Sequence, residues 1–88
     1  MVDVDVVWSR IRRHEGEDFT QVRGARFIYR VDGNAIVPNR TNRRLQKSQF
    51  ARALGRLPVS GPGHLQELQG PSYIYAILMD ARIRGSDW

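Results

Sequence analysis

Asp32-Gly33-Asn34 is the feature that most restricts how this 88-residue chain can fold. Glycine and asparagine tolerate the positive φ angles of a tight hairpin loop. Before this tripeptide, residues 26–31 alternate between the two faces of a predicted strand, and after it residues 35–37 form an apolar return strand that Pro38 ends. A third short run at residues 19–22 precedes both. The middle of the chain therefore predicts a three-stranded antiparallel meander.

Segments before and after this predicted sheet in the chain show the helical spacing of apolar residues. Apolar residues recur at i, i+3, i+4 and i+7 in segments that begin near residue 4, near Ser48 and after Gly70, which predicts three helices. Ser48 and Ser72 are the expected N-caps of the second and third of these, and Gly85 is the expected end of the last. A short helical turn is expected near residue 65. The order predicts an α+β fold, in which a small three-stranded sheet is flanked by an N-terminal helix and two to three C-terminal helices.

The length and composition predict one domain, residues 1–88, in a reducing compartment. The chain has no cysteine, so it offers neither a disulfide nor a thiolate metal site. No stretch approaches the roughly 20 apolar residues of a membrane-spanning helix. The first five residues lack the basic lead and apolar run of a secretory signal. The predicted location is cytoplasmic.

The basic residues are concentrated in one part of the chain. The formal net charge is +5, but residues 19–56 hold nine basic residues and a single acid, Asp32, a net charge of +8. Such a one-signed segment attracts polyanions. Of the 14 cations 13 are arginine, whose planar fork suits phosphate and carboxylate. Genome composition is a competing explanation for the choice of arginine, but explains the clustering less well.

The loop at residues 40–44, with Lys47, is the main candidate for a ligand-binding segment, because it joins a predicted strand to a predicted helix and carries residue types that contact phosphate oxygens. Basic residues of the neighbouring strand and helix would extend it. We therefore predict a small basic module that binds nucleic acid, DNA foremost, through phosphate contacts. The predicted contact residues are Arg26, Arg30, Arg40, Thr41, Asn42, Arg43, Arg44, Lys47, Arg52 and Arg56.

Two other interpretations remain open. The same basic residues could dock on an acidic protein partner, with Tyr73, Tyr75 or Trp88 as anchors, since aromatic and Arg residues dominate interface energetics. The loop could also be a solvated connection whose charges only maintain solubility. Phe27 and Tyr29 could stack on bases, but their inward alternation favours a place in the core.

Catalysis has little support in the sequence, so the protein is not expected to be an enzyme or to carry a metal or cofactor. His14 and His64 lack a metal-ligand spacing. An acidic group after the first predicted helix, residues 15–18, is better explained as a solvated loop than as a cation site. No serine stands in a nucleophile-elbow pattern, and Gly61-Pro62-Gly63 lacks the Lys and Ser or Thr of a phosphate-binding loop.

A wider pattern of residues resembles a group of small bacterial proteins of unknown function, which short open reading frames of actinobacteria encode. The pattern covers most of the chain and comprises Trp8, Ile11, Gly16, Phe19, Gly24, Phe27-Ile28-Tyr29, Gly33, Pro38, Arg40-Thr41, Ser48, Phe50, Ala53-Leu54 and Gly70-Pro71-Ser72-Tyr73. The resemblance implies no catalytic residues and leaves the ligand open.

Overall fold

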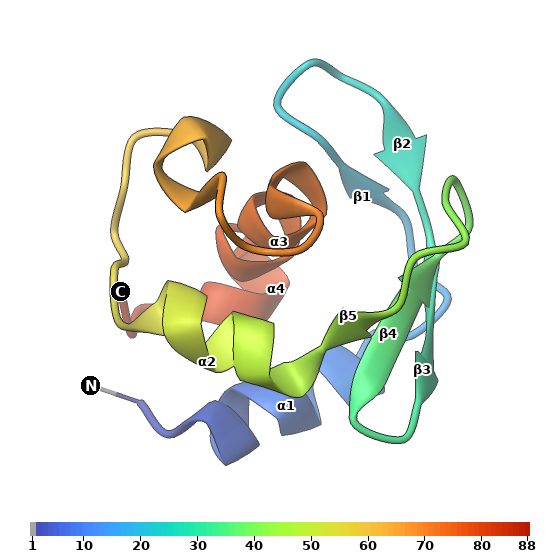
Figure 1. The fold of residues 1–88 in the computed structure, drawn as a ribbon. Coiled ribbons are helices and arrows are strands. Elements are labelled where there is room, and N and C mark those ends of the chain that lie inside the picture. The colour runs from blue at the N-terminus through green and yellow to red at the C-terminus, as the bar shows by residue number, and fades with distance from the viewer. Residues whose placement is uncertain (1) are drawn as a thin grey trace.

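The computed structural model describes residues 2–88 as an α+β fold, with the helices gathered on one side of two small sheets (Figure 1). The elements of the described residues are α1 (Val4–Arg13), β1 (Phe19–Thr20), β2 (Arg26–Phe27), β3 (Tyr29–Asp32), β4 (Ala35–Pro38), β5 (Leu45–Gln46), α2 (Lys47–Leu54), the 3-10 helix η1 (Pro62–Leu65), α3 (Pro71–Leu78) and α4 (Ala81–Arg84). No helix in this part of the chain has the length and apolar character needed to cross a membrane.

The predicted hairpin forms, and it builds the larger sheet. β3 and β4 pair antiparallel around Gly33, whose φ of 62° is the positive value that the loop requires. β5 pairs with the other edge of β4, so that Val31, Ile36 and Leu45 stand side by side across the three strands. The α+β class and the three-stranded antiparallel sheet are confirmed.

The third strand of this sheet is not the one predicted. Residues 19–22 were expected to provide it, but β1 pairs with β2 in a separate two-stranded sheet. The predicted strand at residues 26–31 is divided at Ile28, because the backbone there bonds to Asn39. Phe27 on one side of the division pairs with Phe19, and Tyr29 on the other side pairs with Pro38.

Both expected serine caps are wrong. β5 continues through Gln46, and α2 begins directly after it with Gln46 as an N-cap that makes no side-chain bond, so Ser48 lies inside the helix. α3 begins after Gly70, with Pro71 in its first turn. The hydroxyl of Ser72 instead accepts a hydrogen bond from Gln21 Nε2 at 3.1 Å, which ties α3 to the β1–β2 hairpin.

The expected last helix is interrupted near Asp80. α3 ends at Leu78, and Asp80 then caps α4 by accepting a hydrogen bond from the backbone N–H of Arg82 at 2.9 Å. Gly85, the expected end, follows α4.

The core lies between the helices and the two sheets (Figure 1). Trp8 of α1 meets Phe50 of α2 edge to face, with ring centroids 5.5 Å apart. Phe27 and Tyr29 are buried, as expected from their inward alternation. The Tyr29 hydroxyl donates to the carbonyl of Ile11 at 2.6 Å, joining β3 to the last turn of α1, and burial raises the pKa of this phenol far above its usual range.

The outer edge of β3 is covered by the segment that follows α1. Gly16 N–H donates to the carbonyl of Tyr29 at 3.0 Å, and the carboxylate of Glu15 accepts from the N–H of Val31 at 2.6 Å. These backbone groups would otherwise be free to pair with another strand. This edge of the sheet is therefore covered at the carbonyl of Tyr29 and the N–H of Val31.

Candidate nucleic-acid interface

Arg26, Ile28 and Arg30 form a row of outward-facing side chains that runs from β2 into β3. They alternate with the buried Phe27 and Tyr29, which places them on the opposite side of the backbone. Ile28 is 38% exposed, one of few large apolar side chains of the described residues at the surface. An apolar residue thus lies between two arginines on an open face.

The predicted binding loop, residues 40–44, is anchored to the middle of this row by the residue that precedes it, Asn39. Asn39 donates its backbone N–H to the carbonyl of Ile28 at 2.9 Å, and its side-chain Oδ1 accepts from the N–H of Ile28 at 3.0 Å. Thr41 Oγ1 accepts from the N–H of Arg43 at 3.2 Å, which shapes the turn. Figure 1 shows the loop beside the junction of β2 and β3. The loop therefore starts beside Ile28, the residue that stands between Arg26 and Arg30 in the row.

Acidic residues pair with half of the eight predicted cations. Arg44 bonds through its side chain to the carboxylate of Asp32, and Arg30 lies 3.8 Å from the same carboxylate. The Arg44 hydrogen bond, reinforced by the charges of Arg44 and Arg30, lowers the pKa of Asp32. Two further pairs involve acids from outside the basic segment. They are Lys47 with Asp5 and Arg56 with Glu67.

Four predicted cations have no carboxylate within ion-pair distance in the described chain. Three of them, Arg26, Arg40 and Arg43, lie in the row or in the loop anchored to it. The fourth, Arg52, lies on α2, which runs away from the sheet alongside α1 (Figure 1). The predicted residues therefore fall into two groups rather than one continuous strip. We call the first group the arginine patch; it comprises Arg26, Arg30, Arg40, Arg43 and Arg44, whereas Lys47, Arg52 and Arg56 belong to the α2 side.

A cleft of about 400 Å³ opens beside the arginine patch, and Arg30 is the residue of the patch that lines it. Ile28, Val37 and Pro38 provide its apolar wall, and we call it the Ile28 cleft. Thr41 and Asn42 line one end of it, so two predicted polar residues lie where the cleft meets the loop. The cleft was not predicted from the sequence, although an apolar Ile28 among outward-facing residues indicated an exposed apolar surface there.

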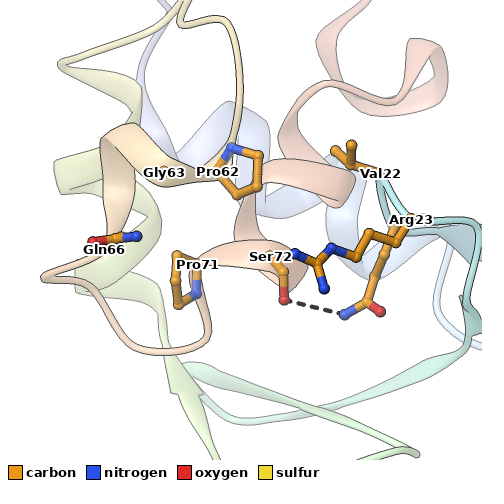
Figure 2. Close-up of a pocket in the computed structure, with 8 residues that line it drawn as sticks. Val22, Arg23, Pro62, Gly63, Gln66, Pro71 and Ser72 are labelled. Carbon is orange, nitrogen blue, oxygen red and sulfur yellow. Dashed lines mark hydrogen bonds between the residues drawn. The ribbon is translucent and has the colours of Figure 1, made fainter.

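A second hollow, of about 390 Å³, lies between the β1–β2 hairpin and the start of α3 (Figure 2). Val22, 66% exposed, and the prolines at 62 and 71 give it an apolar character. Arg23, at the tip of the hairpin, extends across it toward Ser72 in Figure 2. Arg23 was not among the predicted contact residues.

The acidic group after α1 is engaged in structural contacts. Glu17 accepts from Arg82 at 3.0 Å and lies 3.0 Å from His14 Nδ1; these two hydrogen bonds lower its pKa. Arg82 also bonds to Asp80 and stacks 3.9 Å above the ring of Phe19. Within residues 2–88, no group of three or more His, Asp and Glu side chains is arranged to hold a metal ion.

The aromatic anchors suggested for a protein partner are largely engaged. Trp88 donates its indole N–H to the carbonyl of Leu78 at 2.8 Å, and the Tyr75 hydroxyl lies 3.5 Å from the carbonyl of Val59. Tyr73 meets the ring of Phe27 edge to face at 5.0 Å. All three side chains are half-buried against the core, so little of their surface is available to a partner.

Comparison with known proteins gives no match at a significant level, whether to a family model, to a curated protein or to a solved structure. The function is therefore inferred from the geometry of the arginine patch.

Proposed function

We propose that this protein binds nucleic acid through phosphate contacts made by the arginine patch. One observation carries the proposal: Arg26, Arg40 and Arg43 are exposed and have no carboxylate partner in the described chain, and they lie in the row or in the loop that Asn39 bonds to Ile28. An arginine without an acidic neighbour has its full set of donors available for a phosphate. Arg30 and Arg44 share Asp32 and contribute less charge.

The basic residues on the α2 side, Lys47, Arg52 and Arg56, support this role at longer range. Lys47 and Arg56 have acidic partners, so they add little net field, whereas Arg52 adds a full positive charge. Charges separated by more than about 8 Å are strongly screened at physiological salt. We therefore assign the direct contacts to the arginine patch, and the steering of a polyanion to the remaining basic surface.

The test is the double variant R40A/R43A, compared with R12A/R13A. Arg12 and Arg13 are exposed on α1, so the control removes the same charge from another face. Fluorescence anisotropy with labelled single-stranded DNA, duplex DNA and RNA is measured at two salt concentrations. We expect R40A/R43A to weaken binding at least tenfold at low salt. The slope of log affinity against log salt should also fall, by about 0.7 to 0.9 for each phosphate that the variant no longer neutralises. The control should bind almost as well as the wild type.

Equal losses in the two variants would show that net charge alone attracts the nucleic acid. No binding of any of the three probes at low salt would refute the proposed function.

A second candidate is a module that docks on an acidic protein, and the exposed Ile28 favours it. Protein interfaces have an apolar centre with a polar rim, and the exposed Ile28 between Arg26 and Arg30 has that form. If this candidate is correct, a partner captured from lysate will bind the wild type and not R40A/R43A, while all three nucleic-acid probes fail to bind.

A further inference from the structure

We infer that the Ile28 cleft receives one unstacked base of a single-stranded nucleic acid, while the surrounding arginines hold the adjacent phosphates. This inference rests on the proposed function and adds the class of ligand. It begins from a hollow with an apolar wall that Arg30, Thr41 and Asn42 also line, together with the exposed Arg40 and Arg43, which are the chain neighbours of Thr41 and Asn42.

The spacing suits a nucleotide. Arg26 and Arg30 are each two residues from Ile28, which is about 6.6 Å along an extended chain. The loop is joined to Ile28 through Asn39, and Thr41 and Asn42 line the cleft, so Arg40 and Arg43 are the chain neighbours of lining residues. A phosphate on these arginines would leave its base within reach of the hollow.

The walls of the cleft suit the two faces of a base. Ile28, Val37 and Pro38 offer apolar surface that would be shielded from water by a flat ring. Arg30 also lines the cleft, and its side chain is 65% exposed, so its guanidinium plane is free to stack on the ring.

Polar groups at the ends of the cleft suit the edge of a base. Asn42 makes no side-chain hydrogen bond within the described residues, which leaves both its amide donor and acceptor free. Glu15 uses Oε2 to accept from the N–H of Val31, so Oε1 remains as an acceptor. A carboxylate accepts hydrogen bonds from the exocyclic amino groups of bases, as it does from cytosine N4.

Glu15 also argues against an acidic peptide in this cleft. A carboxylate side chain entering it would approach the carboxylate of Glu15, and like charges repel. A nucleotide places its negative charge on the phosphate, outside the cleft, and its donors on the base. Duplex DNA is disfavoured as well, because its bases are stacked and paired and cannot enter a hollow between a strand and a loop.

The experiment compares two labelled strands of equal length and phosphate number, an oligodeoxycytidine and an abasic oligomer, and uses variants I28Q and V22Q. Val22 is an exposed apolar residue of the second hollow, so V22Q is the matched control. We expect the wild type to bind the cytidine strand about five- to tenfold more tightly than the abasic strand. I28Q should reduce the cytidine affinity to the abasic level and leave the abasic affinity unchanged, and V22Q should alter neither. Thermal unfolding of both variants verifies the fold.

Equal affinity of the wild type for the two strands would overturn the base-binding inference but leave the phosphate-binding proposal standing. Equal or tighter binding of duplex DNA of the same phosphate number would also overturn it. Loss of affinity for a polyglutamate peptide in I28Q, with unchanged cytidine affinity, would assign the cleft to an acidic protein. Failure of both strands to bind at low salt would instead refute the proposed function itself.

Discussion

Asn39 and Ile28 are joined by two hydrogen bonds, one from the backbone of Asn39 and one to its side chain. This double contact divides the strand predicted at residues 26–31, and it also fixes the basic loop against the exposed row of Arg26, Ile28 and Arg30. The same pair of residues therefore sets the sheet topology and assembles the arginine patch.

Replacing Asn39 with alanine should uncouple the loop from Ile28. The variant loses one side-chain hydrogen bond, which is worth about 1 kcal/mol of folding free energy. We expect severalfold weaker binding of single-stranded DNA with the salt slope nearly preserved, because the cations remain but are less well positioned. Asn34→Ala, at the hairpin end of the same sheet, is the control. Undiminished affinity in Asn39→Ala would show that the loop needs no anchor.

Replacing Asp32 with asparagine should strengthen binding. Asp32 holds Arg44 and lies 3.8 Å from Arg30, so its neutralisation releases two cations of the arginine patch. We expect severalfold tighter binding at low salt and a slope steeper by about 0.7 for each additional phosphate that is neutralised. The control is Asp87→Asn. It makes the same change in net charge, but near the C-terminus, where Asp87 pairs with Arg10, and it should have a smaller effect. An equal gain in the two variants would contradict a local role for Arg30 and Arg44.

Replacing Gly70 with alanine should destabilise the fold by about 2 kcal/mol. Gly70 has a φ of 49°, and an added Cβ would lie 2.9 Å from Cδ2 of the buried Leu45. The left-handed conformation alone costs a non-glycine residue roughly 1 to 2 kcal/mol. Gly63→Ala, where nothing lies within 4 Å of the added atom, is the matched control. Urea unfolding should show a lower midpoint for Gly70→Ala with an unchanged slope; equal midpoints for both variants would contradict the steric argument.

Lowering the pH should destabilise the protein, because it protonates Asp80. Hydrogen bonding from the side chain of Arg82 lowers the pKa of Asp80 below its usual value, so the folded state binds its proton less readily than the unfolded state. This stabilisation is complete at neutral pH and is lost as pH falls below about 4. Asp80→Asn keeps an acceptor for the cap of α4 but loses the charge; we expect it to cost about 1 to 2 kcal/mol at pH 7 and less at pH 3. Urea unfolding at both pH values measures the difference. A cost that is the same at pH 3 and pH 7 would exclude the charge as its cause.

The local sequence signals predicted those parts of the fold that depend on neighbouring residues. The apolar spacing of Val7, Trp8 and Ile11 predicted α1, and Gly33 marked the hairpin. Leu45 carried no such signal, because a single apolar residue in a polar stretch becomes a strand only when β4 is present to pair with it. Ser48 illustrates the opposite error, since it has the chemistry of an N-cap but β5 runs past the position where a cap would stand.

The sequence predicted which exposed residue types the candidate site contains, but not which of its cations are neutralised by acidic partners. Arg40 and Arg43 are exposed on the predicted loop, as a polar connection requires. The pairing of Lys47 with Asp5, 42 residues away in the chain, depends on the packing of α1 against α2, which no local pattern reports. Charge counted along the chain therefore overstated the field that the folded surface presents.

The covered edge of β3 affects how copies of the protein interact at high local concentration. Copies of a small basic protein that collect on one long polyanion are brought to a local concentration far above that of the bulk solution. Under such crowding, an open strand edge would let neighbouring copies join into a continuous sheet. Glu15 and Gly16 occupy the backbone groups of Val31 and Tyr29 that such joining would need. Pairing of neighbouring copies through this strand would first have to break these two hydrogen bonds.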